Sequence, residues 1–577
     1  MLDNNGLWYR DAVFYEVPVK SFYDSNNDGI GDFNGLTMKL DYLKKLGVDA
    51  LWLLPFYKSP LKDDGYDISD YYSILPEYGT IDDFKNFIDT AHSMNIRVIA
   101  DLVLNHVSDQ HPWFIESRSS IDNPKRDWFI WSDTPEKFKE ARIIFIDTEK
   151  SNWTYDPETK QYYFHRFYSS QPDLNYDNPD VRNEVKKVIR YWLDLGLDGF
   201  RADAVPYLFK RENTNCENLP ETHNFFKEIR KMMDEDYPGT ILLAEANQWP
   251  TETKAYFGNG DEFHMAFNFP LMPRIFIALA RSDYYPIMDI IKQTLPIPDN
   301  CDWCIFLRNH DELTLEMVTD SERDIMYREY AKIPKMRLNL GIRRRLAPLA
   351  DNDINTIELL NALIFSLPGT PIIYYGDEIG MGDNIYLGDR NGVRTPMQWS
   401  YDRNAGFSMA DSEQLYSPVI TNPNYHYESV NVEAELRLSS SLLNWMIKII
   451  HVRKDYKELL GRGSIKFIEQ GNKRVLSYIR EYENQRMLCL FNLSRNPTYV
   501  ELNLSDYIGL KPIEAITKAA FPRIKDDRYF ITMTPRSFFW FNLIVPERDD
   551  SYDLIGEDAN SRVDKLAAAL EHHHHHH

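Results

Sequence analysis

Short apolar runs alternate with helical patterns along most of the chain. Eight of these runs predict strands, and they begin at residues 12, 50, 97, 199, 241, 264, 304 and 370. The segments between them are amphipathic, with apolar side chains at the spacing of one helix face, as in 82–95, 181–196 and 223–236. Alternating strands and helices are typical of a parallel sheet, and eight such units predict an α/β fold, a closed (β/α)8 TIM barrel.

The spacing of the strands predicts an insertion. About 90 residues separate the third predicted strand from the fourth, where a barrel usually needs far fewer. We therefore expect residues 107–178, rich in Trp, Tyr, Asp and Pro, to form a small inserted domain, named domain B here, after strand three. The barrel would then comprise residues 1–106 and 179–462.

A second long segment, residues 313–352, follows the seventh predicted strand and is expected to form a helical excursion from the barrel. It contains Arg343, Arg344 and Arg345. Such a run of charge favours a solvated or ion-paired face over a binding patch.

The pattern changes near residue 464 to strands without intervening helices. Six segments alternate or are continuously apolar between short turns: 464–470, 474–481, 486–493, 498–504, 528–533 and 537–543. They predict a C-terminal antiparallel all-β sandwich domain over residues 463–549. Residues 550–577 are expected to be a tail, and its end, KLAAALEHHHHHH, resembles an expression tag.

The charge and cysteine content of the chain limit its partners. The formal net charge of -23 at pH 7 would repel nucleic-acid phosphates and anionic membrane surfaces, so neither is expected as a partner. No stretch of about 20 apolar residues predicts a membrane span, and no signal peptide is evident. Four cysteines are too few for a disulfide framework, and the Cys301–Cys304 pair has no second pair to indicate a metal or redox site. We expect a cytoplasmic protein with a neutral small-molecule substrate and no organic cofactor.

Charged residues gather at the predicted carboxyl ends of the strands, where barrel enzymes place their reacting groups. Arg201 and Asp203 share one face of the fourth strand, which favours either a structural ion pair or a catalytic carboxylate kept ionised by its neighbour. Glu245 ends the fifth strand and Asp311 the seventh, and strand parity points all three carboxylates inward. The same alternation places His106 and His310 on the opposite face of their strands, so the turn from strand to loop would have to direct them toward the interior of the barrel.

Six motifs in order give the chain a family resemblance. They are DDGYDISDY at 63, DLVLNH at 101, GFRADAV at 199, LLAEANQW at 242, RNHDE at 308 and RTPMQW at 394. With these motifs the chain resembles the alpha-amylase family of glycoside hydrolases and transglycosylases, glycoside hydrolase family 13, over residues 8–546. The resemblance implies a (β/α)8 barrel enzyme acting on α-glycosidic bonds.

The resemblance also implies roles for the three carboxylates. Asp203 would be the nucleophile, Glu245 the general acid and base, and Asp311 the residue that grips sugar hydroxyls in the transition state. Retention at the anomeric carbon needs one ionised and one protonated carboxyl about 5 Å apart. We expect Arg201 to lower the pKa of Asp203, and burial with nearby carboxylates to raise the pKa of Glu245.

Further matched positions are expected to bind the glucosyl ring. They are Asp63, Tyr66, His106, Phe167, Gln171, Arg201, His310 and Arg394. Asp63 and Arg394 would close the far end of the pocket as a charged pair, which favours action on chain ends or small disaccharides.

A loop rich in oxygen donors, DSNNDGIGD at 24, predicts a cation site. Its ligands would be the side chains of Asp24, Asn26, Asp28 and Asp32 with the carbonyl of Ile30, a spacing that suits calcium. Such turns also form without a metal, and the family resemblance favours calcium. The resemblance implies a second calcium between barrel and domain B, held by Asn105, Asp173 and the carbonyls of Tyr207 and Leu208. Both ions would be structural.

Longer stretches resemble one subgroup of the family. They are residues 206–223, 310–327, 339–349 and 376–399, and they imply interconversion of maltose and trehalose with minor hydrolysis to glucose. Asp203 would hold the glucosyl group covalently while the freed glucose turns over, and residues 313–352 are a candidate lid that excludes water. An α-glucosidase, a sucrose isomerase and a non-catalytic binding relative are the alternatives, the last disfavoured by the intact carboxylates. The sequence leaves open the oligomeric state and whether a maltose kinase binds.

Overall fold

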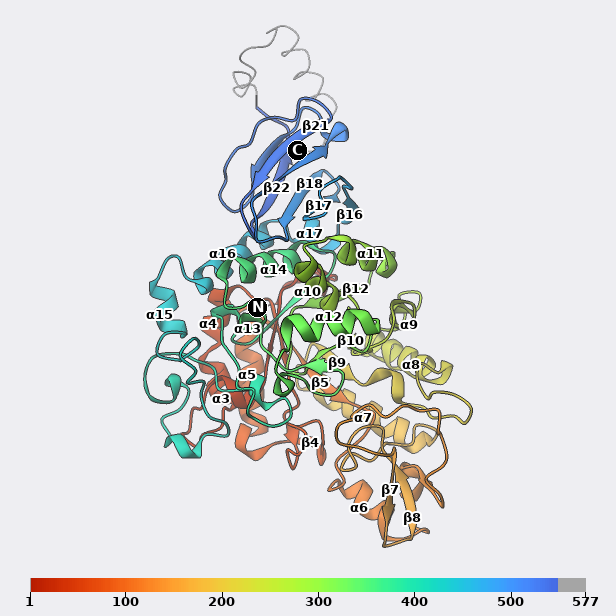
Figure 1. Cartoon of the computed structure of the whole chain (residues 1–577). Helices are drawn as coiled ribbons and strands as arrows, with labels where there is room; N and C mark the ends of the chain where they lie inside the picture. The colour runs from red at the N-terminus through yellow and green to blue at the C-terminus, as the bar shows by residue number, and fades with distance from the viewer. Residues whose placement is uncertain (1, 548–577) are drawn as a thin grey trace, which may run out of the picture.

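Eight parallel strands close into a barrel in the computed structural model, which describes residues 2–547 (Figure 1). The strands are β1 (Phe14–Val17), β2 (Ala50–Leu53), β5 (Arg97–Val103), β9 (Gly199–Asp203), β10 (Ile241–Ala244), β11 (Met265–Phe267), β12 (Asp302–Phe306) and β15 (Thr370–Tyr374). Each pairs in parallel with the next, and β15 closes the ring onto β1. The predicted barrel and its eight strands are confirmed.

Amphipathic helices cover the outside of the barrel. Three of them, α5 (Ile81–Ser93), α7 (Pro179–Asp194) and α8 (Pro220–Asp236), confirm the helices expected from the sequence pattern. α5 begins at Thr80, whose side chain accepts from the Asp83 amide while the Asp83 carboxylate accepts from the Thr80 amide, a capping box. Other helices of the barrel are α1 (Trp8–Asp11), α2 (Val19–Phe22), α3 (Phe33–Met38), α4 (Leu40–Leu46), α9 (Pro250–Lys254), α10 (Leu271–Arg281), α11 (Tyr285–Thr294), α14 (Ile354–Ser366), α15 (Val432–Arg437), α16 (Leu442–Asp455) and α17 (Lys457–Arg462). No helix among residues 2–547 combines the length and apolar character that a membrane crossing requires.

Two insertions extend the loops that follow β2 and β5. After β2 the chain forms a short antiparallel pair, β3 (Tyr57–Lys58) with β4 (Asp70–Ile74). Domain B follows β5 and contains α6 (Pro112–Ser119) and a three-stranded antiparallel sheet in the order β6 (Trp131–Ser132), β8 (Gln161–Phe164), β7 (Trp153–Asp156). In Figure 1 domain B lies in orange at the end of the molecule opposite to the C-terminal strands.

The excursion after β12 is partly helical. It comprises β13 (Leu313–Thr314), α12 (Asp320–Tyr330), β14 (Gly341–Ile342) and α13 (Leu346–Leu349), with β13 and β14 paired antiparallel. Within the run of three arginines, Arg344 pairs with Asp383 at 3.0 Å and Arg345 with Asp377 at 2.9 Å. Arg343 donates to backbone carbonyls instead. The run is therefore held by internal partners, and Arg345 is fully buried rather than solvated.

The C-terminal strands form two sheets with an apolar layer between them. One sheet has the order β16 (Ser464–Phe467), β17 (Val475–Tyr482), β18 (Gln485–Asn492), β22 (Phe538–Ile544), β20 (Lys511–Glu514), and the other pairs β19 (Thr498–Asn503) with β21 (Arg528–Met533). The apolar layer includes Leu488, Leu490, Val500 and Ile531. The sequence pattern missed β20, an edge strand that contains a proline. The expected tail, 550–577, lies outside the described residues.

Candidate active site

The three predicted catalytic carboxylates line one cavity at the carboxyl ends of the barrel strands. Asp203 is the last residue of β9, Glu245 directly follows β10, and Asp311 lies in the loop after β12. The other side chains that line the cavity are Asp63, Tyr66, His106, Ile144, Phe145, Phe167, Tyr207, Asn247, Phe269, Asn309, Glu312, Thr314, Glu316 and Arg390. The cavity therefore joins residues of the barrel, of domain B and of the excursion.

Arg201 binds carboxylates on three neighbouring strands. Its Nη1 lies 3.0 Å from Asp203 Oδ1 and 3.2 Å from Asp101 Oδ2, and its Nη2 lies 3.9 Å from Glu245 Oε2. Only 1% of the Arg201 side chain is exposed, so solvent screens its attraction to these carboxylates only weakly. Arg201 thus forms a buried ion pair with Asp101 and also contacts Asp203 on its own strand.

Glu245 has the environment of a proton donor. Its Oε2 accepts from the backbone amide of Ala204 at 2.8 Å. Burial, followed by the charge of Asp203, raises the pKa of Glu245 well above its ordinary value, despite the nearby Arg201. Ala204 adopts a left-handed backbone with φ of 54°, which is costly for a residue with a Cβ and directs its amide toward Glu245. No sequence signal indicated this turn.

Asp311 is held ionised by three cations. Its carboxylate lies 2.6 Å from Arg390 Nη1, 3.2 Å from His310 Nε2 and 3.4 Å from Arg394 Nη2. Burial raises the pKa of Asp311, but these charges outweigh burial and the net pKa lies well below its usual range. Asp311 faces the cavity as predicted, but it does so from a loop rather than from the strand, because β12 ends at Phe306. The same loop brings His310 in beside Tyr66 at 2.8 Å.

The charged pair expected between Asp63 and Arg394 is replaced by two other pairs. Asp63 Oδ1 pairs with Arg390 Nη2 at 2.9 Å, and Arg394 Nη1 pairs with Asp64 Oδ2 at 3.1 Å. Burial raises the pKa of Asp63 to about 7 even with Arg390 beside it. Arg390 bridges Asp63 and Asp311, yet the sequence analysis did not select it. It lies within the 376–399 stretch, one turn before Arg394, and that proximity was the only available signal.

Domain B contributes one wall of the cavity. Phe167 packs against His106 with ring centroids 5.3 Å apart, and Gln171 Nε2 donates to Asp63 Oδ2 at 2.7 Å. Burial lowers the pKa of His106, which favours its neutral form. Domain B is also tied to the excursion, because Arg142 Nη1 lies 3.3 Å from Glu316 Oε2. Neither Arg142 nor Glu316 was selected from the sequence.

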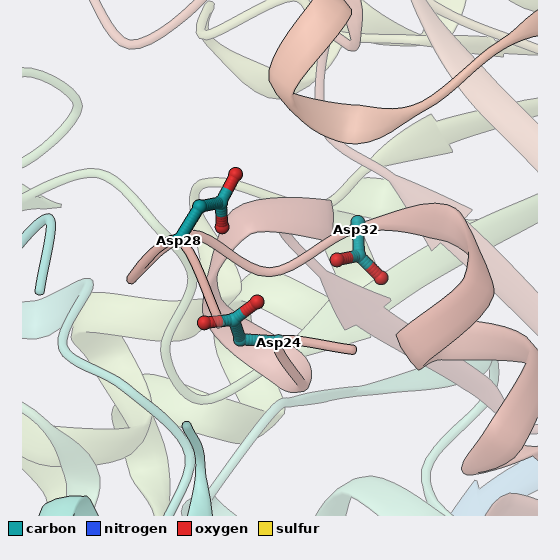
Figure 2. A group of neighbouring side chains, drawn as sticks. All are labelled: Asp24, Asp28 and Asp32. Carbon is teal, nitrogen blue, oxygen red and sulfur yellow. The ribbon is translucent and has the colours of Figure 1, made fainter. Parts of the chain in front are cut away.

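The predicted cation loop brings its carboxylates together. Asp24, Asp28 and Asp32 each offer an oxygen, and these oxygens lie within 4.8 Å of one another (Figure 2). The Asn26 side-chain nitrogen donates to Asp24 Oδ1 at 2.9 Å and to Asp28 Oδ1 at 3.0 Å, and the Ile30 backbone amide donates to Asp28 at 3.0 Å. Burial, with repulsion from Asp24, raises the pKa of both Asp28 and Asp32. This set of oxygens fits a hard cation such as calcium.

The residues predicted to hold a second calcium do not fit one, which corrects that expectation. Lys210 Nζ lies 2.7 Å from Asp173 Oδ2, 3.2 Å from Asn105 Oδ1 and 3.1 Å from the Leu208 carbonyl. An ammonium group therefore binds the oxygens that would have coordinated the ion. The Tyr207 ring lines the sugar cavity and packs against Phe167 with centroids 5.5 Å apart.

A closed parallel barrel with carboxylates gathered at the carboxyl ends of its strands is an arrangement that suits an enzyme acting on glycosidic bonds. The chain belongs to the alpha-amylase family: residues 17–340 and 342–463 match "Alpha amylase, catalytic domain", and residues 465–540 match "Maltogenic Amylase, C-terminal domain".

Named relatives include trehalose synthases and an isomaltulose synthase. The chain is 58% identical over 553 residues to "Trehalose synthase/amylase TreS" of Mycolicibacterium smegmatis, covering 94% of this chain and 93% of that protein. It is 55% identical over 553 residues to "Trehalose synthase" of Pimelobacter sp., covering 94% and 96%. Among solved structures, isomaltulose synthase from Klebsiella sp. LX3 is similar with a TM-score of 0.75 and 29% identity, covering 93% of this chain and 99% of that one.

The protonation of His310 makes the stability of the fold depend on pH. Burial lowers the pKa of His310, but Asp311 and Glu16 raise it to a net value of about 9. A histidine in the unfolded chain titrates near about 6.5. The two ion pairs therefore stabilise the fold fully below about pH 6.5, and this contribution is lost as the pH rises through about 9.

We predict that Glu16→Gln weakens this dependence. The variant should lose about 2 kcal/mol of stability at pH 6, because the ion pair with protonated His310 becomes a hydrogen bond to a neutral amide, and less at pH 9. Urea unfolding at both pH values measures the difference. Glu77→Gln, which changes an exposed carboxylate, is the control. An equal loss at both pH values would contradict the assignment to His310.

Proposed function

We propose that this protein interconverts maltose and trehalose by intramolecular transfer of a glucosyl group. The observation that carries the proposal is that Asp203, beside the Arg201 guanidinium, and Glu245, whose pKa is raised, line one cavity. The identity of 58% to a protein named trehalose synthase supports the choice of substrates.

The first half of the reaction breaks the glycosidic bond. Asp203 Oδ attacks the anomeric carbon of the non-reducing glucose, and the bond from that carbon to the glycosidic oxygen breaks. Glu245 donates its proton to the departing oxygen, so the products are a glucosyl ester of Asp203, free glucose and a Glu245 carboxylate. The raised pKa of Glu245 favours the protonated carboxyl that this step requires.

The second half re-forms a glycosidic bond at a different oxygen. The freed glucose turns within the cavity and presents its anomeric hydroxyl in place of its 4-hydroxyl. Glu245 removes the proton of that hydroxyl, its oxygen attacks the anomeric carbon of the glucosyl ester, and Asp203 departs as a carboxylate. Two retaining displacements therefore convert maltose into trehalose without net consumption of water.

The charged end of the cavity recognises the transferred ring. Asp311, ionised through Arg390, His310 and Arg394, provides acceptors for sugar hydroxyls. Arg390 also binds Asp63, and this pair closes the cavity behind a single ring. We therefore propose that only a terminal glucose enters and that longer chains are excluded.

Two insertions, domain B and the 313–352 excursion, cover the cavity and exclude water from it. Phe145 and Phe167 of domain B and Thr314 and Glu316 of the excursion line the same cavity. The Arg142–Glu316 ion pair joins the two insertions over the site. We propose that they act together as the lid that retains glucose, so the 313–352 excursion forms one half of that lid.

A structural calcium in the Asp24 loop is part of the proposal. The Asp24, Asp28 and Asp32 carboxylates would hold the ion with Asn26 and the Ile30 carbonyl. The ion would neutralise their mutual repulsion and brace the start of α3, whose first turn Asp32 caps through the Gly35 amide at 2.7 Å. The chemistry at Asp203 and Glu245 requires no metal. We also propose a cytoplasmic location, because the four cysteines are free and buried.

Product analysis tests the substrate assignment. Incubation with maltose, followed by NMR of the anomeric protons, should show trehalose as the main product with minor glucose. Asp203→Ala should lower the rate by about 10⁴-fold or more, because it removes the nucleophile, while the exposed Asp320→Ala control keeps wild-type activity. Glucose as the only product would identify an α-glucosidase, and reaction with sucrose but not maltose a sucrose isomerase.

The lid is tested by the proportion of hydrolysis. Glu316→Gln removes the ion pair with Arg142 and should raise the ratio of glucose to trehalose about two- to fivefold, as expected for loss of about 1 kcal/mol of pairing. Arg328→Met, which breaks an exposed ion pair with Glu329 on the same excursion, is the matched control. An unchanged ratio in Glu316→Gln would remove this ion pair from the lid.

Calcium binding is tested by thermal unfolding. Saturating calcium at about 100 times its dissociation constant should stabilise the wild-type protein by about 2.7 kcal/mol, and EDTA should reverse the shift in melting temperature. Asp28→Ala, at an exposed ligand, should remove the calcium response with little effect in EDTA. Asp122→Ala, an exposed aspartate of domain B, should respond as the wild type does. A calcium shift that persists in Asp28→Ala would contradict the site.

A further inference from the structure

Lys210 joins three segments that are distant in the sequence. Its ammonium binds Asn105 at the end of β5, Asp173 at the end of domain B, and the Leu208 carbonyl in the loop after β9. Only 5% of Lys210 is exposed. A buried ammonium is costly unless its hydrogen bonds are made, and here the three oxygens provide a carboxylate, an amide and a carbonyl.

The ammonium determines which way the Asn105 amide faces. A lysine side chain can only donate, so the atom that faces Lys210 must be the amide oxygen of Asn105. The amide nitrogen of Asn105 is thereby directed to His106 Nδ1, 3.2 Å away. The opposite amide orientation would set two donors against each other.

The Asn105 amide in turn selects the tautomer of His106. Because Asn105 Nδ2 donates, His106 Nδ1 must accept, and the ring proton lies on Nε2. His106 Nε2 then donates to the Tyr66 carbonyl at 3.1 Å. Both His106 and Tyr66 line the sugar cavity, so this chain of contacts ends at the proposed substrate site.

We propose that Lys210 is a positioning residue that takes the place of a bound cation between barrel and domain B, and that it fixes through Asn105 the orientation and tautomer of His106. The effect on activity rests on the proposed function. The replacement of a cation by Lys210 does not rest on the proposed function, because thermal unfolding measures it in the absence of any sugar.

Exchange of the Lys210 ammonium for a divalent ion tests whether Lys210 takes the place of a bound cation. Lys210→Glu adds a carboxylate to Asn105, Asp173 and the Leu208 carbonyl, and should create a calcium site. In EDTA this variant should melt at a lower temperature than the wild type and show at least tenfold lower kcat/KM. Added calcium should restore both, with kcat/KM within about threefold of the wild type. The wild type, titrated in parallel, reports the response of the Asp24 loop alone.

The amide relay is tested at Asn105. Asn105→Asp keeps an oxygen for the ammonium but removes the donor to His106 Nδ1, so His106 must carry a proton on Nδ1. The melting temperature should stay within a few degrees of the wild type, while kcat/KM falls about tenfold and its pH profile shifts as His106 gains a carboxylate partner. Arg211→Met, which removes the neighbouring exposed cation bound to Asp177, should change neither quantity.

Two results would overturn the inference. If calcium raises the melting temperature and kcat/KM of Lys210→Glu no more than those of the wild type, Lys210 does not occupy a replaceable cation position. This conclusion holds whether or not the variant is folded in EDTA. If Asn105→Asp retains wild-type kcat/KM and pH profile, Lys210 does not act on His106 through the amide. Failure of the maltose assay itself, with the calcium response of Lys210→Glu intact, would count against the proposed function alone.

Discussion

The buried guanidinium of Arg201 is the interaction on which the arrangement of the site depends. It contacts Asp101 on β5 and Asp203 on its own strand, and it lies near Glu245 after β10. β5 and β9 pair with Asp101 directly opposite Arg201, so the backbone register itself places the counter-charge. Without the guanidinium, two or three largely buried carboxylates would lie close together without a counter-charge, which is costly for ionised groups.

The same distribution of charge separates the acidic side chains into two kinds. Asp311 lies among Arg390, Arg394 and His310, and its pKa falls, whereas Glu245 lies deeper among carboxylates and its pKa rises. In the proposed reaction Glu245 is the proton donor, whereas Asp311 stays ionised and accepts hydrogen bonds from the substrate. The chain as a whole carries a net charge of -23, so these cations are a local concentration inside an acidic protein.

The cover over the cavity depends on how the insertions attach to the barrel. Domain B is held at its base by backbone hydrogen bonds, such as that from Leu174 to the Asn105 carbonyl at 2.9 Å, and by the Lys210 ammonium. At its outer edge it reaches the excursion through the Arg142–Glu316 pair. The base is buried and the outer contact is partly exposed, so the outer contact is the one suited to opening and closing.

The sequence by itself determined the barrel, because each strand is an apolar run bounded by polar residues and each helix has a continuous apolar face. It also selected Asp203 and Glu245, since both lie at or directly after strands whose ends are visible in the pattern. Local patterns failed where a long-range partner or a turn decided the result: the proline-containing strand β20, the left-handed turn at Ala204, and the loop that carries Asp311. Only the tertiary structure paired Asp63 with Arg390 and placed the Lys210 ammonium where a calcium was expected. These outcomes depend on charges that meet across the barrel from distant segments, and their mutual energies are not encoded in the spacing of neighbouring residues.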